Sequence, residues 1–225
     1  FVLPETNLPD LRGVDPETAS KTIREEWGIG EKTIKNMVHL LESKGVRVFS
    51  LAEMNKEVDA YSFWHDDRAY VFLNTFKSAE RSRFDAAHEL AHLVLHRHGS
   101  PVGKDIEIEA DRFASAFLMP AGSVYPVAAK FPALEDLIRL KQRWAVSLAA
   151  LVRRFKDLEI ITEWHYRTLT IEMSKRGYLK SEPNGIERES SLILTKVFNS
   201  LRNQRIDRRK LAAILEIPEF ESGFK

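Results

Sequence analysis

The sequence predicts an α+β fold: a small antiparallel sheet packs on one long helix, and a mostly helical region follows. Two observations support this. Alternating apolar residues, rich in aromatic and β-branched types, are confined to residues 46–74, whereas apolar residues at helical spacing govern most of the remaining chain. Of the 225 residues, 44% are hydrophobic and 30% are charged, which is typical of a globular protein.

The first part of the chain is expected to be helical. Residues 1–14 are rich in proline and predict an extended linker. Asp15 and Pro16 suit the start of a helix that Gly28 ends, and a second helix within residues 31–45 ends at Gly45. We expect the two helices to form a hairpin.

Three short strands follow, in residues 46–51, 58–64 and 69–74, and the turn "HDDR" joins the last two. A long helix is predicted from about Ser82 to His98, and the apolar stripe of "EIEADRFASAFLMP" predicts another that Pro120 ends. The rest is helical, with two helices broken at residues 145–147 and a basic-headed helix within residues 205–221. We therefore divide the chain into residues 1–14, 15–121 and 122–225.

Composition excludes several classes of protein. Lys and Arg number 34 against 33 Asp and Glu, so no overall charge favours nucleic acid or a membrane surface as partner. The absence of cysteine rules out disulfides and thiolate metal sites and is typical of the cytoplasm. No signal peptide or membrane-length apolar run is found. Because the chain begins at Phe1 without a Met, we expect it to be a fragment.

The segment "HELAH" contains the residues suited to metal binding and acid–base catalysis. His88 and His92 are four residues apart, so on a helix they share one face and can bind one metal ion. Glu89 can act on a water at that ion as general base and then pass the proton to the leaving amine. Titratable groups beside a buried helix face are costly unless a metal satisfies them, which favours a metal site over core histidines.

A catalytic zinc needs a third protein ligand. His98 has a suitable spacing but would require a turn-forming Gly where Leu95 stands, and His96 lies a further turn along the helix. An acidic residue of the next helix remains, and the candidates are Glu107, Glu109 and Asp111. Periodicity does not choose among them, although Glu107 lies nearest the apolar stripe.

"RSRFDAAHELAHLVLH", then "EIEADRFASAFLMP", preceded by "VDAYSFW" and "AYVFLN", resembles the ImmA/IrrE family of cytoplasmic zinc metallopeptidases, which have a zincin-like fold. The resemblance covers most of the chain. It implies Zn²⁺ as cofactor, with His88, His92 and Glu109 as ligands and Glu89 as general base and acid. Glu107 is the alternative ligand. Ala91 stands where the usual family helix has Gly.

The resemblance also implies a function: cleavage of a regulatory protein, such as a DNA-binding repressor or an antitoxin-like protein, in prophage, mobile-element or stress-response control. Residues 22–48 are similar to family members that carry an N-terminal Xre-type helix-turn-helix domain, through which DNA would be bound. The alternative is a non-proteolytic sensor or regulatory module of such a transcriptional regulator.

Other candidates are less specific. His165, Tyr125 and Tyr166 are possible donors to the oxyanion, and the hairpin before the metal-binding helix could bind substrate backbone along its edge. Two stretches are similar to helix-turn-helix fragments, with basic residues suited to phosphate at Arg143, Arg153, Arg154, Arg205, Arg208 and Arg209. The near-neutral charge favours a helical scaffold over a DNA-binding surface for this region.

Overall fold

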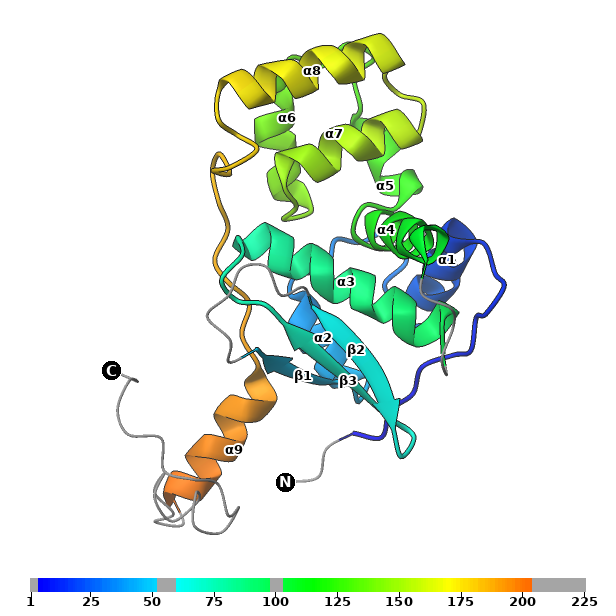
Figure 1. Cartoon of the computed structure of the whole chain (residues 1–225), viewed down its shortest axis with the longest axis vertical. Coiled ribbons are helices and arrows are strands. Elements are labelled where there is room, and N and C mark those ends of the chain that lie inside the picture. The colour runs from blue at the N-terminus through cyan, green and yellow to red at the C-terminus, as the bar shows by residue number, and fades with distance from the viewer. Residues whose placement is uncertain (1–3, 52–59, 98–102, 204–225) are drawn as a thin grey trace.

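The computed structural model describes residues 4–51, 60–97 and 103–203 (Figure 1). Its strands are β1 (Arg47–Ser50), β2 (Tyr61–His65) and β3 (Arg68–Leu73). Its helices are α1 (Pro16–Glu26), α2 (Met37–Ser43), α3 (Ala79–Leu95), α4 (Lys104–Leu118), α5 (Ala121–Val124), α6 (Leu134–Leu140), α7 (Leu148–Asp157), α8 (Glu163–Lys175) and α9 (Leu192–Asn203), with 3-10 turns η1 (Tyr125–Val127) and η2 (Lys141–Arg143). The expected α+β class is confirmed.

The three strands form one mixed sheet in the order β1-β3-β2. β2 and β3 are an antiparallel hairpin, as expected, and Asp66 and Asp67 at its turn have φ of 46° and 55°. β1 runs parallel to β3, although we expected a wholly antiparallel sheet. The alternation of apolar residues shows which face of a strand is buried but not the direction of its neighbour.

Helix α3 lies at the centre of the fold, between the sheet and α4 (Figure 1). Ser78 caps it by accepting a hydrogen bond from the Arg81 backbone at 3.1 Å. The sheet turns its buried face, with Val48, Val71 and Leu73, into the same core as α3. From α3 the core takes Ala86, Ala87, Leu90, Leu93 and Val94. The helix begins three residues earlier than expected and is capped at His96; His98 lies outside the described residues.

The two N-terminal helices do not form the expected packed hairpin. α1 packs mainly against α4, and α2 packs against α3 and β1. Asn36 caps α2 by accepting from the His39 backbone at 2.8 Å, so this helix starts only at Met37. Residues 4–14 form neither helix nor strand, and the Leu11 N–H donates to the Val94 carbonyl at 2.9 Å.

The helices α5 to α8 form a second layer beyond α4 (Figure 1). As expected, α4 ends just before Pro120, and α6 and α7 are separated at residues 145–147, where Ala145 has a φ of 53°. The predicted helix within residues 205–221 lies outside the described residues. No helix in the described part of the chain is long and apolar enough to cross a membrane.

Candidate metal centre

The histidines of α3 lie one turn apart and converge. The Nε2 atoms of His88 and His92 are 3.0 Å from each other. Both rings are largely shielded from solvent, with 16% and 22% of their side-chain surface exposed. One ring nitrogen of each histidine therefore faces the same point, which is the arrangement from which two imidazoles can bind one metal ion.

A carboxylate from α4 completes this group. Glu107 places Oε2 at 3.2 Å from the His88 Nε2 and Oε1 at 3.6 Å from the His92 Nε2. Nitrogen and oxygen ligands about 2.0–2.1 Å from a tetrahedral zinc ion stand about 3.3 Å from one another. The separations of 3.0 Å between the two Nε2 atoms and 3.2 Å between Glu107 Oε2 and the His88 Nε2 lie close to this value, so these residues fit a zinc ion.

His88 and His92 each form a second contact through Nδ1, the ring nitrogen that is not part of the metal group. Asp111, one turn after Glu107 on α4, places Oδ1 at 2.9 Å from the His88 Nδ1. The Nδ1 atoms of His92 and His96 are 3.0 Å apart. Hydrogen bonds of this kind fix the orientation and tautomer of metal-binding histidines. Asp111, one of our three acidic candidates, thus occupies an outer position.

Glu109, the ligand that the family resemblance implied, does not join the two histidines. Its Oε2 is 3.0 Å from the His96 Nε2, so it reaches His92 only through His96. Two residues rotate a helical side chain by about 200°, which is why Glu107 and Glu109 cannot share one position. The structure therefore brings His88, His92 and Glu107 together and places Glu109 behind them.

The environment sets different protonation states for the two histidines. Burial, aided by the neighbouring His88 and His96, lowers the pKa of His92 to about 4, so its ring is neutral at pH 7. Burial also disfavours a charged His88. The hydrogen bond that the His88 Nδ1 donates to Asp111, together with the nearby carboxylates, outweighs it and raises the pKa of His88. A carboxylate-rich shell that attracts a proton to this point also attracts a metal cation.

Glu89 is buried beside the group, with 4% of its surface exposed. Ser62 on β2 donates a hydrogen bond from its Oγ to the Glu89 Oε2 at 2.6 Å. Burial raises the pKa of Glu89 to about 7, although the Ser62 hydrogen bond opposes the shift. A carboxyl with such a pKa can both accept and release a proton near neutral pH. Ser62 was not among the residues predicted from the sequence. Because side chains alternate between the two faces of β2, Ser62 lies on the α3 side of the sheet, as Trp64 does.

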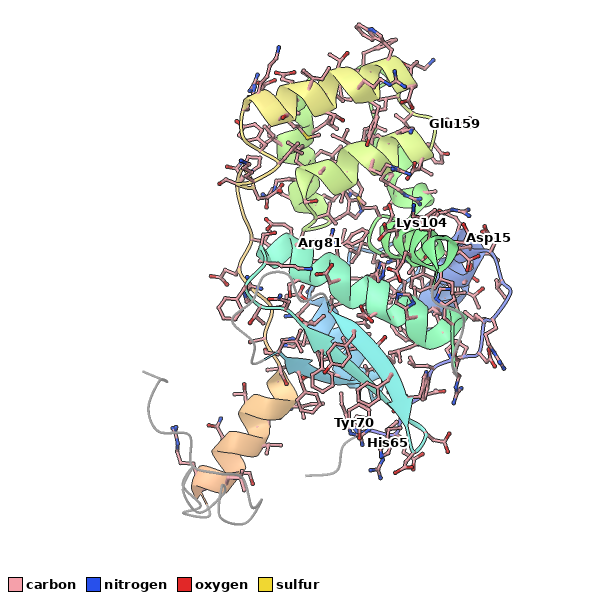
Figure 2. All side chains as sticks on the ribbon, in the orientation of Figure 1. Asp15, His65, Tyr70, Arg81, Lys104 and Glu159 are labelled. Atoms are coloured by element: carbon pink, nitrogen blue, oxygen red, sulfur yellow. The ribbon has the colours of Figure 1, made fainter. Side chains whose placement is uncertain are left out.

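A cavity of about 630 Å³ opens over these groups. The edge strand β2 forms one wall, and α3 and α4 form the others. Its lining residues are Ala60, Tyr61, Ser62, Arg81, Asp85, His88, Glu89, His92, Glu107 and Asp111. Figure 2 shows Arg81 at one end of α3, beside the helical layer.

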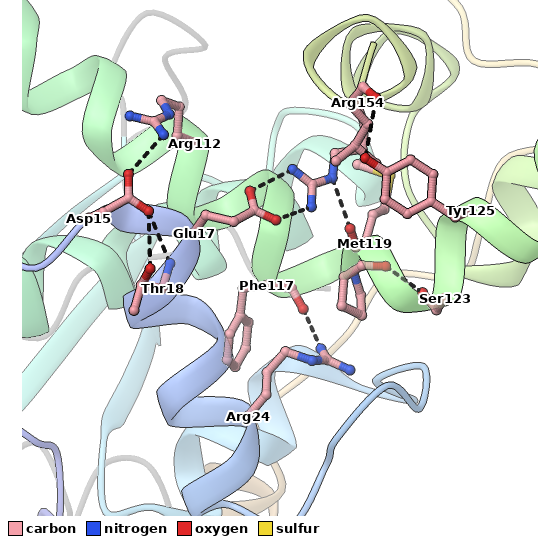
Figure 3. A network of polar contacts seen from close by, with 12 residues as sticks. Asp15, Glu17, Thr18, Arg24, Arg112, Phe117, Met119, Ser123, Tyr125 and Arg154 are labelled. Carbon is pink, nitrogen blue, oxygen red and sulfur yellow. Dashed lines mark hydrogen bonds and ion pairs between the residues drawn. The ribbon is translucent and has the colours of Figure 1, made fainter. Parts of the chain in front are cut away.

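The three expected oxyanion donors do not line this cavity. The Tyr125 hydroxyl donates to the Leu158 carbonyl at 3.3 Å (Figure 3), and the His165 ring stacks on Phe131 with centroids 6.1 Å apart. The Tyr166 ring lies 4.9 Å from the Lys156 Nζ. These side chains belong to the layer beyond α4: Tyr125 lies in η1, and the other two lie in α8. The hydroxyl and guanidinium donors that do line the cavity are Tyr61, Ser62 and Arg81.

The arginines considered for phosphate binding are engaged within the protein. Arg153 pairs with Asp157 at 2.9 Å. Arg154 is buried, forms a two-armed ion pair with Glu17 and donates to the Met119 carbonyl at 2.9 Å (Figure 3). Arg143 lies over the Trp144 ring, and Arg205, Arg208 and Arg209 lie outside the described residues. These contacts support the scaffold interpretation of α6 and α7.

Comparison with known proteins adds a family. The model of the Peptidase_M78 family, described as an IrrE N-terminal-like domain, matches residues 41–156. No curated protein matches the chain significantly. Among solved structures, the chain is similar to a Mycobacterium tuberculosis transcriptional regulator at 16% identity and a TM-score of 0.46. The match covers 64% of this chain and 47% of the regulator, so the chain spans about half the length of that protein.

Proposed function

Because the chain belongs to the Peptidase_M78 family of IrrE N-terminal-like domains, we propose that it is a zinc-dependent endopeptidase that cleaves a regulatory protein. The observation that carries this proposal is the grouping of His88, His92 and Glu107 beside the buried carboxyl of Glu89. A structural metal site has no use for a buried carboxyl beside its ligands.

We propose that His88, His92 and Glu107 hold the metal, with Glu109 acting behind His96 as an outer partner. Glu107 is preferred to Glu109 because its carboxylate meets both histidine Nε2 atoms. When bound, zinc lowers the pKa of a coordinated water toward about 7 and polarises the scissile carbonyl. Asp111 and His96 keep the two rings aimed at the ion.

Glu89 is the proton carrier in this proposal. Its ionised form takes a proton from the attacking water, and the resulting neutral acid gives that proton to the leaving amine. Ser62 holds the carboxyl toward the cavity by its hydrogen bond to Oε2. The groups available to bind the developing oxyanion are Tyr61 and Arg81, which line the same cavity.

The substrate backbone is expected to add to the edge of β2. This strand is the outer one in the order β1-β3-β2 and pairs only with β3 among the described residues. An extended peptide can therefore use the unpaired backbone groups of β2 and lie along the wall of the cavity. As the family resemblance implies, we propose as substrate a DNA-binding repressor or an antitoxin-like regulator in prophage, mobile-element or stress-response control.

The test compares wild type with Glu89→Gln after both are loaded with zinc. We expect both proteins to bind about one zinc ion, measured by elemental mass spectrometry, and only wild type to cleave a randomised peptide mixture. Equal cleavage by Glu89→Gln would contradict the assigned mechanism. Zinc binding by wild type without any cleavage would favour a non-proteolytic regulatory module of a transcriptional regulator.

A further inference from the structure

A second cavity, of about 320 Å³, adjoins the one over the metal group. It lies between α3, α4 and α7, and Arg81 and Asp111 line both cavities. Asp111 is also the residue that holds the His88 Nδ1 at 2.9 Å. The second cavity therefore begins directly behind a residue that touches the metal group.

The walls of this cavity are mainly apolar. Phe84 comes from α3, Ile108 from α4, and Ala149 and Ala150 from the first turn of α7. Ile108 is 55% exposed, although it is a large apolar residue. An apolar surface of this kind, set in a concavity, is typical of a site that takes an apolar group.

Charges around the rim are balanced, which argues against an ionic occupant. Arg81 pairs with Asp85 at 2.8 Å, Arg112 with Asp15 at 2.9 Å and Arg153 with Asp157 at 2.9 Å. Each arginine that lines the cavity thus has a carboxylate partner. An acidic or basic occupant would have to compete with these pairs, whereas an apolar one would not.

One residue that lines the cavity has a buried polar atom without a hydrogen-bond partner among the described residues. The Ser115 Oγ is buried and has no hydrogen-bond partner among the residues that the structure describes. Ser115 lines the cavity, and only 8% of its surface is exposed. Buried hydroxyls are nearly always hydrogen-bonded, so this atom is available to a polar group of the occupant.

We propose that this second cavity is a side-chain subsite of the peptidase, which takes an apolar side chain of the substrate residue next to the scissile bond. Leu, Met and aromatic side chains match the apolar walls in chemistry. Since Ala149 and Ala150 belong to α7, the helical layer takes part in substrate selection. The inference rests on the proposed function, because the metal group fixes where the scissile bond lies.

The experiment uses dipeptide hydroxamates that differ only in the side chain beside the hydroxamate: Leu, Phe, Ala, Asp or Lys. The hydroxamate binds zinc, so the neighbouring side chain is presented to the subsite without any need for cleavage. Binding to the zinc-loaded protein is measured by isothermal titration calorimetry for wild type, Ala149→Trp and Ala129→Trp. Ala149 is exposed at the cavity, and Ala129 is an exposed alanine that lines neither cavity.

For wild type we expect Leu and Phe to bind at least about tenfold more tightly than Asp or Lys. Ala149→Trp should reduce this preference to about twofold or less, while Ala129→Trp should keep it. Zinc-dependent binding with equal affinities, or an unchanged preference in Ala149→Trp, would overturn the subsite but leave the peptidase proposal intact. A protein that binds no zinc would overturn both.

Discussion

Glu107 and Glu109 are two residues apart on α4 and reach different atoms of the metal group. We predict that Glu107→Ala removes most of the bound zinc, because it deletes a direct ligand. Glu109→Ala should keep the site but weaken zinc affinity by about 10–100-fold, since it acts through His96. Competition with a zinc-binding dye measures both affinities.

A matched control is available on the same helix. Asp105 is an exposed acid in the first turn of α4 and does not line the cavity, so Asp105→Ala should bind zinc as wild type does. Loss of zinc in Glu109→Ala with retention in Glu107→Ala would reverse the assignment of the third ligand.

Ser62 lowers the pKa of Glu89, the proposed proton carrier. Its hydrogen bond stabilises the ionised form of Glu89, so Ser62→Ala should raise the pKa of that carboxyl. The base is active when ionised, and activity falls as the pH drops through its pKa. The acidic limb of the pH profile of kcat/KM should therefore move to higher pH, by up to about one unit.

The exposed Ser174→Ala on α8 serves as control and should leave the profile unchanged. An acidic limb that stays in place or moves to lower pH in Ser62→Ala would show that Ser62 does not act on the base.

The spacing of His88, Glu89 and His92 could be interpreted from the sequence because a helix converts a four-residue separation into one face. The third ligand could not, because the relative rotation of α3 and α4 decides which carboxylate faces the histidines. Ser62 and the oxyanion donors depend on how the sheet and the helical layer are placed against α3, and a single sequence does not encode this as a local pattern.

At the scale of elements, caps and turns explain the observed boundaries. Asp15, Ser78 and Ser147 each accept a hydrogen bond from the backbone three residues later, and such residues can be recognised in the sequence. The parallel direction of β1 is set instead by long-range packing. The N-terminal helices likewise find their main partners in α3, α4 and β1, which no local signal indicates.

Gly45, between α2 and β1, is sensitive to substitution. Its φ is 80°, and a Cβ there would lie 2.2 Å from the Glu5 carbonyl oxygen. We predict that Gly45→Ala lowers the free energy of unfolding by about 2–4 kcal/mol, from backbone strain and overpacking together. Chemical denaturation measures this change.

Gly28→Ala is the matched control, because Gly28 has a φ of 68° but nothing within 4 Å of a Cβ. It should cost only about 1–2 kcal/mol, the price of the left-handed conformation. Equal losses in the two variants would mean that the contact with Glu5 is unimportant.

At the scale of the whole molecule, the segment of residues 181–191 joins the helical layer to the rest of the fold. It lies between α8 and α9, beside one end of α3 (Figure 1). Glu182 pairs with the fully buried Lys141 at 3.2 Å, and Glu189 pairs with the buried Arg83. Glu189 also accepts from the backbone of Met37 at 2.8 Å and thereby caps α2.

Removing the Glu189 side chain should therefore break two contacts: the ion pair with Arg83 and the hydrogen bond from the Met37 backbone. Glu189→Ala leaves the Arg83 guanidinium buried without its carboxylate, and we predict a loss of about 3–5 kcal/mol in the free energy of unfolding. Glu187, an exposed neighbour, gives the control Glu187→Ala, which should change stability by less than about 0.5 kcal/mol. Similar midpoints of urea unfolding for both variants would refute the role of this ion pair.

The expected division of the chain at residue 121 remains a prediction, but contacts and sequence similarity cross it. Arg154 of α7 binds both Glu17 of α1 and the Met119 carbonyl, and the family match runs from residue 41 to 156. The cavity between α3, α4 and α7 is also lined by residues from both sides of this division. Sequence pattern placed a boundary at residue 121 but could not show that residues on its two sides share a surface.

The ion pair between Glu17 and Arg154 joins residues 137 positions apart in the chain (Figure 3). During synthesis α1 leaves the ribosome before α4 and α7, so it lacks both its α4 surface and its Arg154 partner until those helices have followed. A chain that stops before α7 lacks Arg154, so Glu17 stays without this ion-pair partner. The attachment of α1 to α7 consequently forms only after Arg154 has been synthesised.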